Sequence, residues 1–374
     1  MPITGSATLE ATARYRDRFK PQTADNHFRN EQSLWLSSIG IGTYLGNADD
    51  STDRAYTDAI VRAVELGGNV IDTASNYRFQ RSERSIGKAL QALTTQHGFS
   101  REELLICTKA GYIPFDGAPP RDVRTYLDEK FVQPGIARFE DFVGGSHCMT
   151  PSFLENQLRQ SLENMNLDCV DVHYVHNPES QLGFVAREDF YARLRRAFEF
   201  LEKAIAEGRI RMYGLATWNG FRVPPESREH HSLLRMVELA REVGGESHGF
   251  RFIQLPFNLG MPEALTLANQ SIGEAGEGEL VSVLEAAAVL GVTVVSSASI
   301  LQGRVAQGLP ETIREPLGSL ATDAQTAIQF VRSTPGITTA LVGMSSRQHV
   351  EENLELVRVE PVHPEDFNRM FGAE

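Results

Sequence analysis

The sequence has 374 residues, of which 41% are hydrophobic and 23% are charged, so it is long enough for one barrel with insertions or for two ordinary domains. A formal net charge of -13 argues against an extended surface for nucleic acid or for anionic membranes, although it leaves room for a local pocket that binds a small anion. The three cysteines, Cys107, Cys148 and Cys169, are widely spaced without a metal-ligand pattern, so we expect no metal site, no disulfide framework and a reduced, cytoplasmic location.

The first segment in chain order, residues 1–32, is polar and charged. It lacks the apolar core of a cleavable signal, and no later apolar run is long enough to span a bilayer. We therefore interpret this segment as an N-terminal extension and residues 33–374 as a single domain.

From residue 38 onward, strand-like segments alternate with helix-like segments, as in right-handed βαβ units around a parallel sheet. Strands are expected at residues 38–44, 69–73, 104–108, 170–175, 210–215, 252–256, 292–296 and 339–342. Amphipathic helices are expected at residues 51–66, 84–93, 151–165, 190–206, 233–243, 279–290, 322–332 and 346–357. A closed (β/α)8 barrel, or TIM barrel, needs eight strands, so the predicted fold is an α/β protein of this class.

Three segments break this alternation, and we expect them to be loops at the chemically active end of the barrel. The longest, residues 112–149, follows the third strand and is rich in glycine and proline, yet it contains several aromatic residues. We expect this insertion either to fold over the substrate as a lid, or to pack on the barrel or on another subunit. The other two loops are residues 219–230 and 258–278.

Four ionisable residues stand at or just beyond the ends of predicted strands: Asp72, Tyr77, Lys109 and His176. The carboxyl ends of barrel strands are where active-site groups gather. Reduction of a carbonyl requires a proton donor, a means of lowering the pKa of that donor, and hydrogen-bond donors around the developing oxyanion. Tyr77 is the expected proton donor, and the Lys109 ammonium is expected to lower the pKa of its phenol. Asp72 is expected to keep the lysine charged, and His176 to hydrogen-bond the carbonyl oxygen.

Each of these residues also has a structural alternative. An aspartate after an apolar run is often a turn or cap residue, a tyrosine there is often a packing residue, and a lysine often lies in solvent. His173 competes with His176, and alternation along the strand places the two on opposite faces. A lysine at a strand end also permits Schiff-base chemistry, so an aldolase or lyase that uses Lys109 is an alternative function.

Four short motifs occur in a fixed order: IDTASNY at 71–77, SE at 82–83 with Gly87, TK at 108–109 and DVHYVHNP at 171–178. Through them, and over residues 36–356, the sequence resembles the aldo-keto reductase superfamily. The resemblance implies a (β/α)8 barrel that binds a nicotinamide cofactor without a Rossmann domain. It also implies Tyr77 as general acid, Lys109 and Asp72 as the residues that tune it, and His176 as the residue that positions the carbonyl.

By the same resemblance, the nicotinamide end of the cofactor lies against residues 42–44 and Gln254, the pyrophosphate along residues 297–304, and the adenosine on residues 343–353. This last segment follows an apolar strand and opens a helix, so its backbone N–H groups and Arg347 favour a 2′-phosphate. NADP is therefore the expected cofactor, and NAD is the alternative. The residues expected to contact it are Gly42, Thr43, Tyr44, Asp72, Thr217, Gln254, Ser297, Ile300, Gln302, Arg304, Gly343, Ser345, Arg347, His349, Glu352 and Asn353.

Two cofactor positions depart from the family pattern. Many relatives have a Ser-Asn pair after the fifth strand, whereas this chain has Ala-Thr at 216–217, so Thr217 or Asn219 is expected to take over the carboxamide contact. Ser297 stands where an aromatic residue usually stacks on the nicotinamide. Tyr44 or Trp218 is expected to fill that role.

Arg78 directly follows Tyr77, where relatives usually have glycine. A cation there suggests a substrate with an acidic or polyhydroxy group. The predicted function is an NADP-dependent oxidoreductase that interconverts a small carbonyl compound (an aldehyde, ketone or sugar) and an alcohol by hydride transfer. A nicotinamide-binding regulatory subunit with little turnover is a further alternative. We expect no nucleic-acid or membrane partner, and the oligomeric state stays open.

Overall fold

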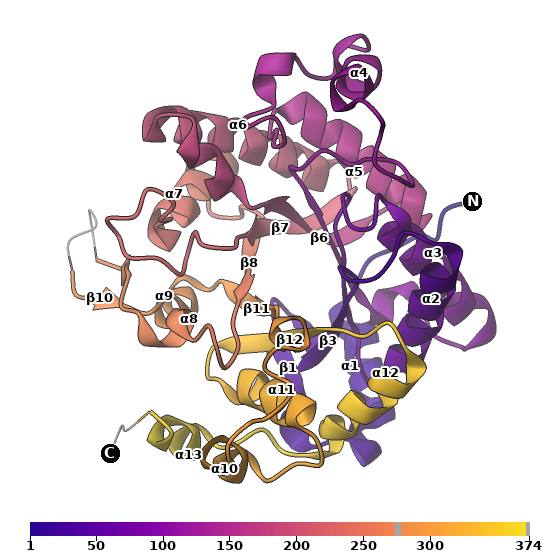
Figure 1. Ribbon diagram of the computed structural model, residues 1–374, viewed down its shortest axis with the longest axis vertical. Helices are drawn as coiled ribbons and strands as arrows, with labels where there is room; N and C mark the ends of the chain where they lie inside the picture. Colours follow the sequence, from indigo (N-terminus) through magenta and orange to yellow (C-terminus); the bar gives the residue numbers. More distant parts are fainter. Residues whose placement is uncertain (274–277, 372–374) are drawn as a thin grey trace.

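The centre of the molecule is a closed barrel of parallel strands in a computed structural model that describes residues 1–273 and 278–371. Figure 1 shows the strands around one centre with helices outside them. The strands follow one another in chain order, and β12 pairs with β3 to close the barrel. They are β3 (Ile39–Gly42), β4 (Val70–Asp72), β5 (Leu105–Ala110), β6 (Val170–His176), β7 (Ile210–Ala216), β8 (Phe250–Pro256), β11 (Thr293–Ser297) and β12 (Ile337–Gly343). All expected strands are present, and the predicted fold class is confirmed.

The helices between the strands lie close to their expected positions. They are α2 (Asp50–Glu65), α3 (Arg81–Gln96), α5 (Pro151–Met165), α6 (Arg187–Ala206), α7 (Leu233–Gly244), α9 (Val283–Leu290), α11 (Asp323–Ser333) and α12 (Arg347–Leu354). The main difference is at α9, because Leu280–Val281 forms the short strand β10 instead and pairs with β9 (Gln270–Ser271). Ser282 and Glu285 then form a reciprocal capping box that fixes where α9 begins.

The side chains that point into the barrel form an apolar core of their own. This core includes Cys107 on β5 and Val172 and Tyr174 on β6. Because side chains alternate along a strand, the next inward positions toward the carboxyl ends are Lys109 on β5 and His176 on β6. The apolar filling of the barrel therefore ends where the ionisable residues begin.

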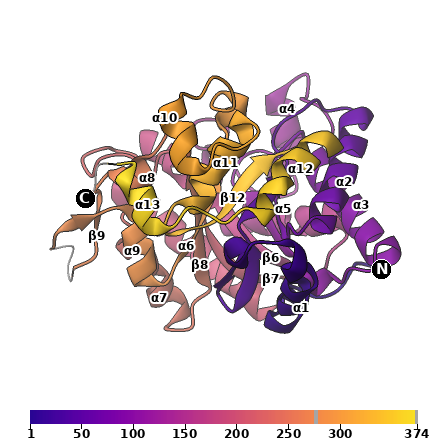
Figure 2. The same cartoon turned by 90° about the horizontal axis from the view of Figure 1, so that it is seen from below.

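The N-terminal segment closes the opposite end of the barrel. It contains α1 (Leu9–Phe19) and a hairpin of β1 (Phe28–Glu31) and β2 (Leu34–Ser37), and Figure 2 shows α1 at one end of the barrel with α4 and α10 toward the other. Leu34 and Leu36 join the apolar core inside the barrel. The expected boundary after residue 32 lies in the turn of this hairpin. It therefore separates two paired strands, with β1 in the extension and β2 in the expected barrel domain.

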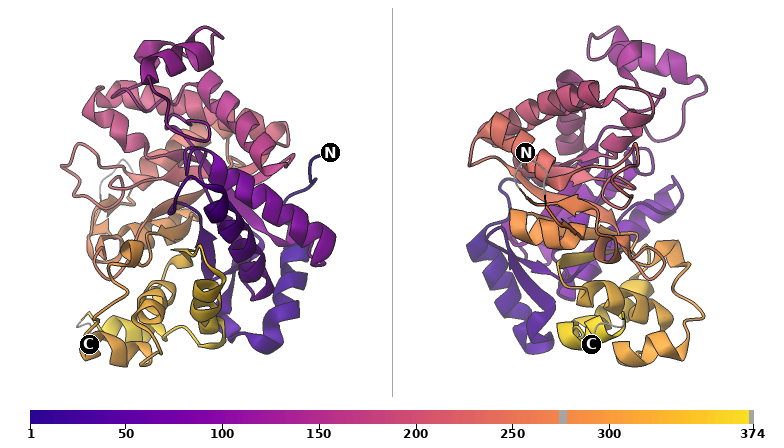
Figure 3. Two further views of the ribbon diagram at one scale, coloured as in Figure 1. Left: turned by 45° about the vertical axis from the view of Figure 1, so that its right-hand side comes forward. Right: turned by 90° about the vertical axis from the view of Figure 1, so that its left-hand side faces the viewer.

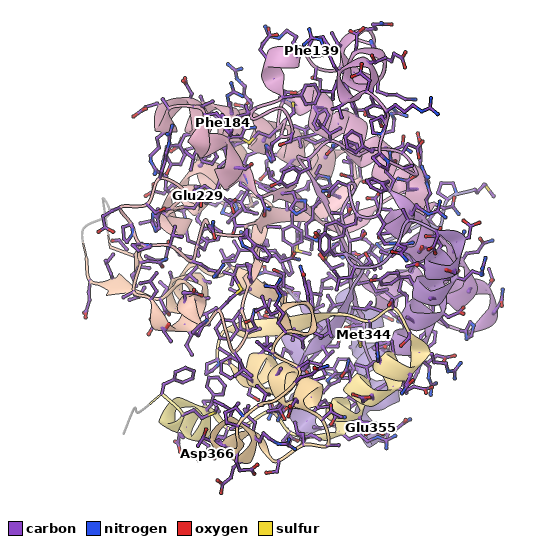
Figure 4. All side chains as sticks on the ribbon, in the orientation of Figure 1. Phe139, Phe184, Glu229, Met344, Glu355 and Asp366 are labelled. Carbon is purple, nitrogen blue, oxygen red and sulfur yellow. The ribbon has the colours of Figure 1, made fainter. Side chains whose placement is uncertain are left out.

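The insertion at residues 112–149 has a small core of its own. It contains α4 (Val123–Leu127), a π-helical turn (Asp128–Val132) and a 3-10 turn (Phe139–Asp141). Phe131 and Phe142 pack on Phe153 of α5. Figure 3 shows the insertion projecting at the end of the molecule away from the C-terminus, and Figure 4 labels Phe139 near its outer edge. Of the two expected roles, the aromatic residues therefore serve packing on the barrel.

The two shorter irregular segments are loops for most of their length. Residues 219–230 contain no helix or strand, whereas residues 258–278 contain the one-turn helix α8 (Glu263–Thr266) and β9. Residues 274–277 of the latter lie outside the described residues. The C-terminal part adds the short helices α10 (Glu311–Arg314) and α13 (Pro364–Arg369). Within the described part of the chain, no helix combines the length and the apolar character needed to cross a membrane.

Candidate active site

A cavity of about 420 Å³ lies at the carboxyl end of the barrel. Asp72, Tyr77 and His176 line it, and Lys109 lies behind Asp72. The structure therefore brings all four expected catalytic residues together. They come from three neighbouring strands and from the loop that follows β4.

Lys109 and Asp72 form an ion pair whose side chains are 1% and 6% exposed. Lys109 Nζ donates to Asp72 Oδ1 at 2.5 Å and to the main-chain oxygen of Thr73 at 2.6 Å. Burial opposes the charge on Lys109, but the Asp72 carboxylate, together with Tyr77 and Cys107, outweighs burial and raises the pKa of the amine. Because a buried, protonated amine is not a nucleophile, this geometry argues against the Schiff-base alternative.

Tyr77 lies beside this pair, with Lys109 Nζ 4.9 Å from the centre of its ring. Burial raises the pKa of the Tyr77 phenol, and the Lys109 charge lowers it without reversing the rise. Lys109 therefore lowers this pKa as expected, but burial and the Asp72 charge together outweigh the lysine, and the net pKa stays above its ordinary value. The consequence is that the phenol keeps its proton at neutral pH, as a proton donor must.

His176 forms the other wall of the reaction centre. Its ring packs edge-on against the rings of Tyr77 and Tyr112, with centroid distances of 5.8 and 5.1 Å. Burial and the Lys109 charge lower its pKa well below the usual range, so the imidazole is neutral. His173, by contrast, does not line the cavity, as the alternation along β6 predicts.

Arg78 points away from the cavity, so the expectation of a cation at the reacting centre is wrong. Its guanidinium pairs with Asp53, and its Nε donates to the main-chain oxygen of Asn47 at 2.9 Å. Arg78, Phe79 and Gln80 have φ angles of 48°, 58° and 70°, and this left-handed turn directs the arginine outward. Among the described residues, no lysine or arginine lines the cavity.

Ten of the residues expected to bind the cofactor line the cavity. They are Gly42, Thr43, Tyr44, Asp72, Thr217, Gln254, Ser297, Ile300, Gln302 and Gly343. Gly42 and Gly343 are partners across β3 and β12, and a Cβ atom on either would meet no atom closer than 3.9 Å. This pair leaves bare backbone against which a flat ring fits. The Thr217 hydroxyl is buried without a hydrogen-bond partner, so it is free to bind a ligand.

Gln254 contacts a catalytic candidate as well as the cavity. Its Nε2 donates to Asp72 Oδ2 at 2.8 Å. Its second N–H and its amide oxygen are left for a ligand carboxamide. Gln254 also fixes the second oxygen of the Asp72 carboxylate, which holds Lys109.

The remaining expected cofactor residues do not line the cavity and lie beyond the ends of β11 and β12. They are Arg304, Ser345, Arg347, His349, Glu352 and Asn353. Ser346 caps α12 by accepting a hydrogen bond from the His349 N–H at 3.2 Å. Arg347 pairs with Glu351 at 3.0 Å and is 65% exposed. Of these, Ser345, Arg347 and His349 lie at the start of α12, where free N–H groups favour an anion.

Sequence reasoning missed several residues of the cavity wall and its support. Tyr112 and Asn177 line the cavity. Glu179 Oε1 accepts hydrogen bonds from the backbone N–H groups of Trp218 and Asn219 at 2.6 and 3.0 Å. Burial raises the pKa of Glu179 to about 7 although these N–H groups oppose the rise. Glu179 gives no sequence signal, because its partners are backbone atoms of a distant loop.

Comparison with known proteins places the chain in a family. Residues 38–223 match the model of the Aldo/keto reductase family. The chain is 30% identical over 186 residues to a D-threo-aldose 1-dehydrogenase from a Pseudomonas species, which covers half of each chain. The chain belongs to the aldo-keto reductase superfamily. The resemblance drawn from the four sequence motifs is confirmed.

Other members and relatives match over almost the whole chain. A putative voltage-gated potassium channel subunit beta from Schizosaccharomyces pombe is 24% identical over 366 residues, 94% of each chain. The structure of an aldo/keto reductase from Klebsiella pneumoniae in complex with NADP and acetate superimposes with a TM-score of 0.59 at 17% identity, covering 94% of this chain and 97% of that one. An aldo-keto reductase from Bacillus halodurans gives 0.58 at 19% identity, with 92% and 95% covered.

The region that matches the aldo-keto reductase model contains all four catalytic candidates and Thr217. It ends before β8, and therefore before Ser297 and Arg347. Within this chain, the catalytic side of the cavity thus lies inside the family match and most of the expected cofactor side lies outside it.

Proposed function

We propose that this aldo-keto reductase is an NADP-dependent oxidoreductase that interconverts a carbonyl group and an alcohol, with Tyr77 as general acid and base. One observation carries the proposal. A protonated phenol and a neutral imidazole line one cavity, and a buried ammonium stands behind them, 4.9 Å from the phenol ring. That combination suits proton transfer to a carbonyl oxygen.

The cavity fits a nicotinamide cofactor. The flat backbone at Gly42 and Gly343 has room for a ring, and the Thr217 hydroxyl is a buried group that still needs a partner. The NADP complex of the Klebsiella pneumoniae relative supports the same choice. When bound, the cofactor supplies or accepts the hydride.

The residues of the chain handle the proton. Tyr77 donates its phenol proton to the carbonyl oxygen, and the Lys109 ammonium stabilises the phenolate that is left. Asp72, held on its other oxygen by Gln254, keeps that ammonium charged and in place. The neutral His176 imidazole donates one N–H to the carbonyl oxygen and so orients the substrate. In the direction of alcohol oxidation, Tyr77 takes the proton back.

The substrate is expected to be uncharged. Tyr44 and Trp218, which are 56% and 43% exposed, stand with Tyr112 around the cavity, and no described lysine or arginine lines it. Aromatic walls with amide groups such as that of Asn177 suit a neutral carbonyl compound or the face of a sugar. This replaces the acidic substrate suggested by Arg78.

NADP is preferred over NAD because Arg347 stands at the start of α12, where a 2′-phosphate also meets the free N–H groups of the helix. We further propose a cytoplasmic location. The three cysteines are buried and unpaired, as in a protein that stays reduced.

A regulatory subunit with little turnover is the second candidate. It is favoured by the full-length similarity to the putative channel subunit beta. Tight binding of NADPH without reduction of any carbonyl would support it.

The test monitors the oxidation of NADPH by its absorbance, with a panel of neutral and anionic aldehydes, ketones and sugars as substrates. We expect turnover of neutral compounds, and Tyr77→Phe should lower kcat by about 10²- to 10⁴-fold while leaving NADPH affinity unchanged. Tyr174→Phe is the matched control, since it also removes a phenol hydroxyl but lies in the apolar core of the barrel and does not line the cavity. Equal losses in both variants, or none in Tyr77→Phe, would remove Tyr77 from the mechanism.

A further inference from the structure

The insertion reaches the reaction centre from behind, through His147. The His147 side chain is 1% exposed. Its Nε2 lies 2.7 Å from the main-chain oxygen of His176, and its Nδ1 lies 3.0 Å from Gln181 Nε2. A carbonyl oxygen only accepts, so Nε2 carries the proton and Nδ1 accepts from the amide. Both ring nitrogens are thus used, and burial lowers the pKa of His147 to about 4, which keeps this form at neutral pH.

The two ends of the insertion hold His147 in this place. The Cys148 N–H donates to the main-chain oxygen of Gly111 at 2.8 Å, and Tyr112 and His147 form an antiparallel bridge. Gly111 is required for the close approach, because a Cβ atom there would lie 2.7 Å from His147 Nε2. The imidazole therefore fills space that a side chain at residue 111 would occupy.

His176 needs support that its own strand does not provide. It is the last residue of β6, and its Nδ1 is buried without a hydrogen-bond partner. The direction of its imidazole is set by its backbone and by ring packing. His147 binds the backbone oxygen of His176, and the Tyr112 ring packs edge-on against both histidines, 5.2 Å from His147 and 5.1 Å from His176.

We propose that His147 is a positioning residue for His176, and that the insertion supports the reaction centre instead of closing over it. The kinetic consequences rest on the proposed function. Without the Nε2–H bond, the strand end and the imidazole shift relative to Tyr77. Small displacements of a positioned group slow a reaction strongly, so we expect a loss of about tenfold in kcat. NADPH affinity should not change, because His147 does not line the cavity.

The experiment compares two substitutions of His147 with one control in the same insertion. His147→Phe keeps a ring but removes the donor, and should lower kcat about tenfold with little change in the Kd for NADPH. His147→Gln keeps an N–H donor at the end of its side chain and should restore most of that loss. Phe131→Leu disturbs the core of the insertion away from His147, and should lower stability without lowering kcat.

A spectroscopic readout separates this proposal from the proposed function. The ring signals of His176, assigned by NMR through a His176→Gln variant, should shift or broaden in His147→Phe and stay as in the parent protein in Phe131→Leu. If the parent protein reduces no carbonyl, the proposed function fails, and these signals still decide whether His147 positions His176.

The proposal is overturned if His147→Phe leaves both kcat and the His176 signals unchanged. It is also overturned if Phe131→Leu lowers kcat as much as His147→Phe does. Should His147→Phe not fold, Gln181→Met carries the test, because it removes the hydrogen bond that holds Nδ1 and so loosens the imidazole that binds the His176 oxygen. We expect a loss of about threefold in kcat from this looser placement, and no change would contradict the proposal.

Discussion

The two sides of the cavity are held in different ways. On the side of β4 to β7, Lys109, Asp72 and Glu179 are buried and bound to one another or to backbone groups. On the side of β11, β12 and α12, Gln302 and Arg347 are exposed. Ala298, Leu301 and Gln302 also have φ angles of 51°, 45° and 56°, which are unusual for residues other than glycine.

This difference matches the tasks proposed for the two sides. Proton transfer requires groups fixed in place before the substrate arrives. Binding of a long, charged cofactor requires accessible backbone N–H groups and a cation that is able to change partner, as Arg347 does if it leaves Glu351 for a phosphate. Substitutions on the first side should therefore change stability and kcat, and substitutions on the second should change cofactor affinity.

The largest effect is expected from Lys109→Met. It leaves the Asp72 carboxylate buried without its cation, which should cost about 3–5 kcal/mol in the free energy of unfolding and lower kcat at least as much as Tyr77→Phe. The double variant Lys109→Met with Asp72→Asn removes both charges. It should recover most of the stability in urea unfolding and none of the activity. Recovery of activity in the double variant would contradict the role given to the lysine.

The second-largest effect is expected in the pH dependence of the free energy of unfolding, through Glu179. Its pKa is raised to about 7 in the folded protein, above the usual value of about 4.3, so the folded state binds the proton more tightly than the unfolded chain. The stability that this proton contributes is present below about pH 4 and is lost as the pH rises toward 7, by at most about 4 kcal/mol. Glu179→Gln should remove this slope from urea midpoints measured between pH 5 and pH 8. A slope that persists in the variant would assign it to another group.

The smallest effect tests the exposed side. Arg347→Ala should weaken NADPH binding about tenfold, the loss of one charge-assisted contact to phosphate, and should leave NADH binding and kcat nearly unchanged. Arg304→Ala is the comparison, because a contact to the pyrophosphate should weaken both cofactors equally. Isothermal titration calorimetry measures the Kd of each of the two variants for NADPH and for NADH. Equal losses of NADPH and NADH in Arg347→Ala would argue against a 2′-phosphate contact.

The sequence predicted the barrel and the four catalytic candidates because both follow from regular geometry. Alternation within a strand and the meeting of strand ends are enough to bring Asp72, Lys109 and His176 together. The direction of Arg78 could not be predicted, since adjacency to Tyr77 says nothing about the left-handed turn that sends it outward. His147 and Glu179 were not assigned a role, because each binds backbone atoms brought near by loop paths that no periodic pattern encodes.

The hairpin of β1 and β2 has a practical consequence for work with shortened forms of the chain. A version starting at residue 33 would keep β2 but lose β1, leaving a bare strand edge at the base of the molecule. The unpaired backbone groups of such an edge tend to pair with strands of other chains. The loss of α1 would also remove Tyr15 from the outer surface of α2. The Tyr15 hydroxyl donates to the main-chain oxygen of Val64 at 2.6 Å. We therefore expect removal of residues 1–32 to cause aggregation before it affects catalysis.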